Sequence, residues 1–232
     1  MPATTSVKPA EPSTSLASTA SVMVVDNQPV FREGLPHLLP ENSGFQITSE
    51  ADGLAEAMQR FHEQPTDLVM TEISLNDGNG LELTQELVAL DPDIRILICS
   101  SYDDALYSER ALRAGAKGYV NKRERTERIL QALNRVSEGL IFLNEEMTER
   151  MLCRTVGQGE QFSQSPIESL SDRELQVFEL IGRGKTTREI ASQLYLSPKT
   201  IESYRENIKV KLNIKNATEL TQHAVRWVVE VD

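Results

Sequence analysis

Short apolar runs alternate with segments of helical periodicity over the first half of the chain. The runs lie at residues 22–25, 45–48, 67–71, 94–99 and 118–120. Continuous apolar runs of this length indicate strands covered on both faces, and the segments between them repeat apolar residues every three or four positions, as helices do. Five strands alternating with helices predict right-handed βα units, and therefore a doubly wound α/β domain with a five-stranded parallel sheet.

A different pattern begins at residue 169, where three helical segments follow one another closely. In "LSDREL", Ser171 can cap a helix and Glu174 stands three residues later, which is the spacing of a capping box. "TTREIASQL" predicts a second helix, and "PKTIESYRENIKVKL" predicts a third with Pro198 in its first turn. The turn "YLS" joins these two helices, so the pattern predicts a smaller all-α domain built on a helix-turn-helix.

Composition places the domain boundaries. Residues 1–20 are rich in Ser, Thr, Ala and Pro and predict a disordered tail, which leaves residues 21–138 for the α/β domain. Residues 139–168 predict a linker with one helix, capped by Asn144, and the stretch "GQGEQFSQSP" within it favours flexibility. Residues 169–232 then form the helical domain, and we expect the two domains to move relative to each other.

The net charge of −11 conceals a difference between the two domains. Residues 169–232 hold ten basic and nine acidic residues, a balance of +1, whereas the rest of the chain holds 14 and 26, a balance of −12. Within residues 185–215 the excess rises to seven basic against three acidic residues, or +4. A local basic surface on an acidic protein is the electrostatic pattern of a nucleic-acid-binding domain.

Other features of the composition narrow the setting. No run approaches the roughly 20 apolar residues of a membrane span, and the first residues lack the charged start and apolar centre of a secretory signal. Cys99 lies in the apolar run "ILICSS", so we expect a buried thiol in a reducing cytoplasm rather than a disulfide with Cys153. The three scattered histidines suggest no metal site.

Polar residues follow four of the predicted strands. Asp26 and Asn27 follow the first strand, Glu72 the third, Ser100 the fourth and Lys122 the fifth. Ligands of doubly wound sheets bind at this edge, outside the carboxyl ends of the strands. Each residue alone is an ordinary polar loop residue. Together, two carboxylates, a hydroxyl and an ammonium group indicate a site for a phosphoryl group or a divalent cation.

The chain resembles the receiver domain of two-component response regulators in the segments "VVDNQPVFREGL", "DLVMTEISLNDGNGLEL", "ILICSSYDD" and "RAGAKGYVNK". Its segment from "LSDREL" to "NATEL" resembles the LuxR-type DNA-binding domain, and the combination resembles the NarL/FixJ family. The resemblance implies a CheY-like fold, an acidic pair that binds Mg²⁺, and an aspartate after the third strand that accepts phosphate from a histidine kinase. Asp26, Ser100, Tyr119 and Lys122 match the family's acidic, hydroxyl, aromatic and lysine positions.

Two residues depart from that pattern. Asn27 replaces the second acid of the magnesium pair, which predicts weak or absent Mg²⁺ binding at Asp26. Glu72 occupies the phosphoacceptor position, and its extra methylene moves the oxygens by about 1.5 Å, whereas a misplacement of about 1 Å can cost roughly 100-fold in rate. We therefore predict no cofactor and no orthodox phosphotransfer from a histidine kinase.

The longer side chain leaves two alternatives for the receiver. Glu72 can reach toward Lys122 and Ser100, and an ion pair there would hold the loops partly as phosphorylation does. The receiver would then rest toward its active arrangement without kinase input. In the other alternative, Glu72 only stabilises Lys122, and the domain is a dimerisation scaffold without a switch.

A helical wheel of residues 198–212 separates the roles within the predicted recognition helix. The core face comprises Ile201, Ile208 and Leu212. The opposite face, expected toward base edges in the major groove, comprises Lys199, Ser203, Glu206 and Val210, with Glu202 and Asn207 at its margins. Expected phosphate contacts come from Lys185, Arg188, Arg205 and Lys209, and the resemblance adds Thr200 to the DNA-binding residues. Neighbouring cations are expected to neutralise Glu206. For Glu202 two alternatives stay open: neutralisation by neighbouring cations, or a hydrogen bond accepted from a cytosine amine.

These features together predict a cytoplasmic transcription regulator that binds double-stranded DNA. Trp227, near the end of the chain, is a candidate anchor for a two-fold partner, and the resemblance implies a homodimer. The alternative is a protein-interaction or dimerisation module in which DNA binding is weak. The sequence has no glycine-rich phosphate loop after the first strand and no nucleophile elbow, so we do not predict an enzyme.

Overall fold

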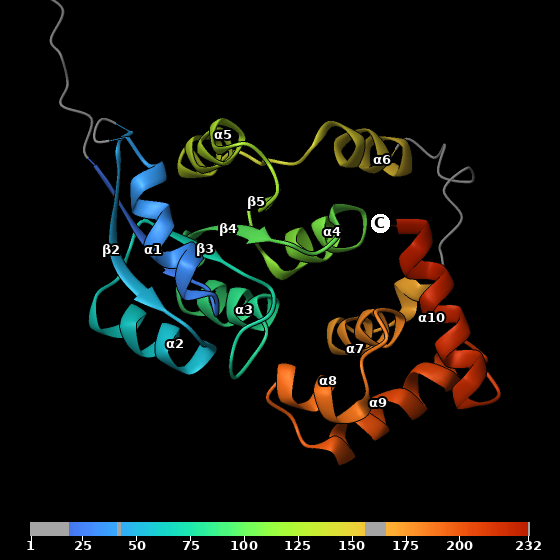
Figure 1. The fold of residues 1–232 in the computed structure, drawn as a ribbon. Coiled ribbons are helices and arrows are strands. Elements are labelled where there is room, and N and C mark those ends of the chain that lie inside the picture. The colour runs from blue at the N-terminus through green and yellow to red at the C-terminus, as the bar shows by residue number, and fades with distance from the viewer. Residues whose placement is uncertain (1–18, 41–42, 156–165, 232) are drawn as a thin grey trace, which may run out of the picture.

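The computed structural model describes residues 19–40, 43–155 and 166–231 (Figure 1). Within these residues, one parallel sheet has five strands in the order β2-β1-β3-β4-β5. The strands are β1 (Ala20–Val25), β2 (Phe45–Ala51), β3 (Leu68–Thr71), β4 (Arg95–Ser100) and β5 (Gly118–Asn121). The structure therefore confirms the predicted doubly wound sheet.

Helices cover both faces of this sheet. They are α1 (Pro29–Leu38), α2 (Leu54–Glu63), α3 (Gly80–Leu90), α4 (Asp104–Ala114) and α5 (Thr126–Ser137). Successive side chains of a strand point to opposite faces, so Met23 and Val25 pack with the layer of α2, α3 and α4, whereas Val22 and Val24 pack with α1 and α5. Burial on both faces explains why the strands are continuous apolar runs.

The α/β domain extends slightly beyond both predicted boundaries. β1 begins at Ala20, inside the predicted tail, because the Ala20 N–H donates to the Gly44 carbonyl at 2.8 Å. Residues 1–18 of that tail lie outside the described residues. At the other end, the buried Phe142 packs against the sheet, and its N–H donates to the Lys117 carbonyl at 2.9 Å. Phe142 therefore belongs to this domain rather than to the linker.

The second domain is helical, as predicted. Its elements are η2 (Pro166–Ser169), α7 (Asp172–Gly182), α8 (Thr187–Gln193), α9 (Pro198–Lys211) and α10 (Ala217–Val231). The predicted capping box is present at the start of α7, between Ser171 and Glu174. Before this domain, α6 (Glu145–Thr155) begins where Asn144 accepts a hydrogen bond from Met147 N–H at 2.8 Å. Most of the predicted flexible stretch lies outside the described residues.

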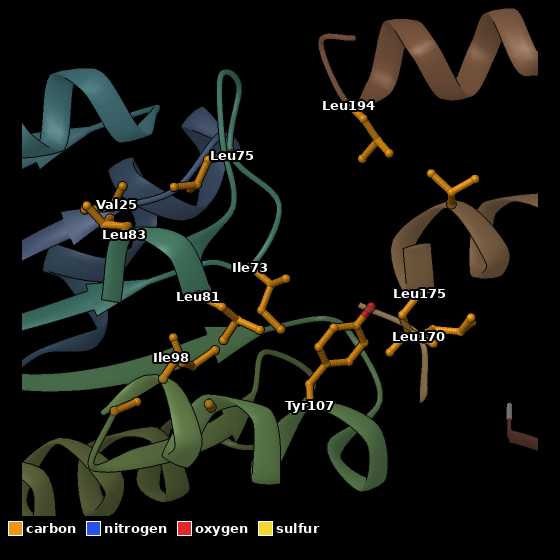
Figure 2. Packing of buried hydrophobic residues seen from close by; sticks show 14 of the residues in the cluster. Val25, Ile73, Leu75, Leu81, Leu83, Ile98, Tyr107, Leu170, Leu175 and Leu194 are labelled. Atoms are coloured by element: carbon orange, nitrogen blue, oxygen red, sulfur yellow. The ribbon is translucent and has the colours of Figure 1, made fainter. Parts of the chain in front are cut away.

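The two domains pack against each other through one continuous apolar layer. Figure 2 shows Ile73 and Leu81 of the α/β domain on one side, Leu170 and Leu175 of the second domain on the other, and the Tyr107 ring pointing toward the latter pair. All five side chains are at least 98% buried. The sequence suggested independent domains, but a docked arrangement removes this apolar surface from water and is favoured by roughly 25 cal/mol per Å² buried.

Ion pairs also link the two domains. From the α/β domain, Arg110 of α4 donates to Asp172 at 2.6 Å and to the Glu168 carbonyl at 3.3 Å. Arg173 of α7 reaches back to Glu82 of α3 at 3.5 Å. Each domain therefore contributes one arginine that pairs with a carboxylate of the other domain.

Among the described residues, no helix is long and apolar enough to cross a bilayer.

Candidate receiver site and DNA-binding surface

The carboxyl edge of the sheet brings together four of the predicted site residues. Asp26 follows β1, Glu72 follows β3, Ser100 ends β4 and Lys122 follows β5. The Lys122 ammonium lies 2.5 Å from Asp26 Oδ2 and 2.7 Å from Glu72 Oε2, between the two carboxylates. All three of these side chains are at least 94% buried. The site is thus a closed group of one cation and two anions.

Glu72 is fixed by further hydrogen bonds. Its Oε1 accepts from the Ile73 N–H at 2.6 Å and from the Ser100 hydroxyl. The lysine opposite is fixed as well, because its ammonium lies 4.4 Å from the centroid of the Phe31 ring, within the range of a cation–π contact. The carboxylate of residue 72 therefore meets the lysine and the hydroxyl that the receiver pattern places around a phosphoryl group.

Burial shifts the pKa values within this site. Burial raises the pKa of Asp26, and its ion pair and hydrogen bond with Lys122 offset only part of that effect. Burial lowers the pKa of Lys122, but attraction to Glu72 and Asp26 outweighs it and leaves that pKa raised. Lys122 consequently stays charged at neutral pH.

A chain of contacts leads from Glu72 toward the second domain. The Tyr102 N–H donates to the Ser100 hydroxyl at 3.3 Å, and the Tyr119 hydroxyl donates to the Tyr102 carbonyl at 2.7 Å. Tyr119 is therefore turned inward and is 2% exposed. The Tyr102 ring lies 5.0 Å from the ring of Tyr107, which is part of the interdomain layer. Packed side chains thus connect the acceptor position to α7.

The second domain also forms a wall of the cavity at Glu72. This cavity has a volume of about 270 Å³. Its receiver lining includes Asn27, Glu72 and Arg123, and α7 contributes Glu179, Leu180 and Arg183. The Asn27 amide oxygen is buried and has no hydrogen-bond partner among the described residues. No pattern in the sequence indicated that α7 lines this cavity, because α7 lies about a hundred positions downstream. The apolar periodicity of α7 shows which of its residues are buried, but not which distant segment its other residues contact.

The residues at this edge do not fit a magnesium site well. Mg²⁺ needs several oxygen ligands in near-octahedral geometry. Asp26 Oδ2 is paired with Lys122, and its Oδ1 accepts from the Gln28 N–H at 2.8 Å. Both Glu72 oxygens are engaged too, and the described residues contain no group of three or more His, Cys, Asp or Glu side chains suited to a metal ion. A cation would have to displace Lys122.

The predicted DNA-binding residues come from α8, α9 and the turn before α8, and most of them are exposed. The exposed members are Lys185, Arg188, Lys199, Glu202, Ser203 and Asn207. The half-buried members are Thr200, Arg205 and Lys209. Ile201 and Ile208 face inward and are buried, as the helical wheel predicted, and Leu212 is half-buried. The packing of the two domains thus leaves most of these residues accessible.

Helix α10 uses its aromatic residue internally. Leu220 and Ala224 are buried, as expected, and the Trp227 ring lies 5.6 Å from the ring of Phe178 in α7. Trp227 also lines a second cavity between the domains, of about 470 Å³. Trp227 is thus half-buried within one chain, and its role as an anchor for a partner stays a prediction.

Comparison with known families agrees with this geometry. Residues 22–134 match the model of the response regulator receiver domain, and residues 168–224 match that of bacterial regulatory proteins of the luxR family. The chain is 32% identical over 209 residues to the oxygen regulatory protein NreC of Staphylococcus carnosus, covering 88% of this chain and 96% of that protein. It is 30% identical over 206 residues to the response regulator UvrY of Escherichia coli K12, covering 89% and 94%.

Solved structures show the same fold. RcsB from Salmonella enterica serovar Typhimurium, bound to a promoter in the presence of the phosphomimetic BeF₃⁻, has a TM-score of 0.60 at 20% identity and covers 89% of this chain and 98% of its own. A LuxR-family response regulator from Aurantimonas has a TM-score of 0.55 at 29% identity, covering 60% and 99%.

The fold and the two sites define a class of protein. A receiver sheet with charged residues at its carboxyl edge, joined to a helix-turn-helix with an exposed basic surface, is a transcription regulator with a receiver domain. The relatives make this more specific. The chain belongs to the NarL/FixJ family of response regulators, whose DNA-binding domain is of the LuxR type, and it is a DNA-binding regulator of that family.

Proposed function

We propose that this regulator binds double-stranded DNA as a homodimer in the cytoplasm, and that its receiver acts without phosphate from a histidine kinase. The observation that carries the second part is the position of Lys122 between Asp26 and Glu72, at 2.5 and 2.7 Å. In a phosphorylated receiver, the family pattern pairs this lysine with the phosphoryl group. Here a carboxylate of the chain itself provides the negative charge.

The contacts around Glu72 support a receiver that rests toward its active arrangement. Ser100 already donates to Glu72, and Tyr119 is already turned inward onto the Tyr102 carbonyl. A phosphoryl group would bring about the same type of contacts by adding charge and acceptor oxygens. Because Ser100 and Tyr119 already make these contacts, phosphorylation would change the conformation of the receiver less.

The surroundings of the site oppose phosphorylation and magnesium binding. Glu179, Leu180 and Arg183 of the second domain wall the cavity at Glu72, so a donor protein would have to displace α7. The oxygens of Asp26 and Glu72 are engaged by Lys122 and by backbone N–H groups. We therefore propose that the receiver holds no resident magnesium ion and transfers no phosphate.

The RcsB structures support the DNA-binding and dimeric parts of the proposal. One describes RcsB bound to a promoter, and another describes two RcsB dimers bound to two parallel DNAs. In this chain, α9 carries Lys199, Arg205, Lys209 and Lys211, of which Lys199 and Lys211 are exposed.

Intact-mass measurement tests the receiver proposal. The full chain is incubated with acetyl phosphate and Mg²⁺, beside the Asn27→Asp/Glu72→Asp double variant, which restores the acidic pattern of the family. We expect no phosphoryl adduct on the natural chain and an adduct on the double variant. A stable adduct on Glu72 of the natural chain would overturn the proposal.

A further inference from the structure

Two glutamates, Glu202 and Glu206, lie on the face of α9 that the fold leaves open for DNA. Their side chains are 56% and 66% exposed. A carboxylate close to DNA is repelled by the phosphates, so its presence on this face needs a compensating interaction. The two glutamates differ in what surrounds them.

Glu206 is neutralised within its own helix. Its Oε1 lies 2.9 Å from the ammonium of Lys209, three residues later. This is a favourable helical spacing, and the pair carries no net charge toward the DNA. Glu206 therefore needs no partner on a base.

Glu202 is held from a neighbouring helix instead. Its Oε1 accepts a hydrogen bond from the Thr187 hydroxyl of α8 at 2.8 Å, while Arg205 lies farther from Oε2, at 3.8 Å. The hydroxyl fixes the orientation of the carboxylate without neutralising it, and each oxygen keeps capacity to accept another hydrogen bond. Contact with a second helix also restricts the Glu202 side chain before DNA binds. The entropic cost of ordering this side chain on binding is therefore smaller.

We propose that Glu202 determines sequence specificity by accepting a hydrogen bond from the exocyclic amine of a cytosine in the major groove. This inference rests on the DNA-binding function. Glu202 is the fifth residue of α9, and the first turns of a recognition helix are the part that contacts base edges. Glu206 stands one turn farther from that end.

The chemistry of the groove favours cytosine over the other bases. A carboxylate only accepts hydrogen bonds, and cytosine presents an amine donor there. Guanine and thymine present acceptor oxygens, which repel a carboxylate, and the adenine amine lies beside the acceptor N7. A bidentate base contact discriminates among bases by roughly 5- to 150-fold, so a single hydrogen bond of this kind falls toward the lower end of that range.

Selection from a random duplex library tests the role of Glu202. The full chain is compared with Glu202→Gln, which keeps the size of the side chain, and with Glu206→Gln as the matched loss of one negative charge. We expect the natural chain and Glu206→Gln to share a cytosine preference of roughly tenfold at one position of each half-site. Glu202→Gln should lose it and gain preference for adenine, because an amide can both accept from and donate to that base.

The outcomes separate this inference from the function on which it rests. If Glu202→Gln selects the same sequences as the natural chain, while thermal unfolding shows all proteins folded, the role of Glu202 is refuted and DNA binding stands. If the natural chain selects no sequence at all, specific DNA recognition fails together with this role. A cytosine preference that Thr187→Val weakens without changing the preferred base would support the orientation of Glu202 by α8.

Discussion

Lys122 and Glu72 form a buried ion pair at the position where receiver domains carry a phosphoryl group. Their charged atoms are 2.7 Å apart, and the two side chains are 6% and 4% exposed. A pair this deeply buried is fixed in place, because separating the partners would leave a charge in a medium of low polarity.

Removal of Lys122 should destabilise the receiver strongly. Lys122→Met leaves Asp26 and Glu72 facing each other without a cation, and breaking a buried ion pair of this kind costs about 3–5 kcal/mol. Urea unfolding measures the loss. Arg60→Ala is the control, because its pair with Glu56 is exposed and is worth about 0.3–0.5 kcal/mol. Equal losses for the two variants would contradict the buried pair.

Glu72→Ala should be milder, since Lys122 keeps Asp26 as its partner. The same substitution should also loosen Ser100 and Tyr119, because Ser100 loses its acceptor. We expect faster amide hydrogen exchange in the segment from Ser100 to Tyr102. Unchanged exchange there would show that Glu72 stabilises the lysine alone, as a scaffold without a switch requires.

Arg110→Ala should weaken the contact between the domains. Arg110 is 15% exposed and bonds to Asp172 and to the Glu168 carbonyl, so its loss leaves both without that partner. We expect increased hydrogen exchange in η2 and at the start of α7. Arg113→Ala is the matched control, because Arg113 lies on the same helix, is 72% exposed, and pairs with Glu109 one turn away. Similar exchange in both variants would argue against a docked interface.

DNA affinity should depend on salt through the basic residues of the second domain. Lys199→Ala and Arg188→Ala should each weaken binding and reduce the slope of log K against log salt by roughly 0.9 for each phosphate that is no longer neutralised. Gel shifts over a salt series measure both. Lys117→Ala, in the receiver, should change neither. Indifference to all three substitutions would favour an interaction module with weak DNA binding.

The helical domain should lose stability in acid through Glu174. Burial raises the pKa of Glu174, but bonds from Lys211 and Ser171 outweigh it and hold that pKa below its ordinary value of 4.5. A carboxylate whose pKa is lower in the folded state stabilises the fold at pH values above its unfolded-state pKa. This stabilisation is lost as the pH falls through the folded-state pKa. Denaturant unfolding measured from neutral pH to below pH 4.5 should therefore show a fall in the free energy of unfolding, and this fall should be smaller in Lys211→Met than in the natural chain. A parallel fall in both proteins would contradict this.

The sequence predicted the sheet and the edge residues for a common physical reason. Parallel strands bring their carboxyl ends to one edge, so Asp26, Glu72, Ser100 and Lys122 had to converge once the strands were assigned. It predicted the α9 surface equally well, because a helix of known period has only one face opposite Ile201 and Ile208.

What the sequence did not predict depends on contacts between distant segments. Tyr107 and Leu175 meet across the interface, yet each already fits the apolar pattern of its own helix. The contact between the rings of Trp227 and Phe178 depends on how α10 packs on α7. The choice of Thr187 as the partner of Glu202 likewise depends on how α8 packs on α9.

Helix α7 contributes to the packing of both domains, because Leu175 faces the receiver while other residues of the helix support the DNA-binding domain. The boundary between the two functional parts of the chain therefore does not coincide with the change in composition that marks the predicted domain boundary. A hybrid that receives a relative's DNA-binding domain from Thr187 onward would keep the native contacts of α7 with the receiver, whereas one exchanged from Pro166 onward would replace Leu170, Asp172 and Leu175 together. Exchange of operator specificity between such proteins is thus limited by the interface with the receiver, not by the recognition helix.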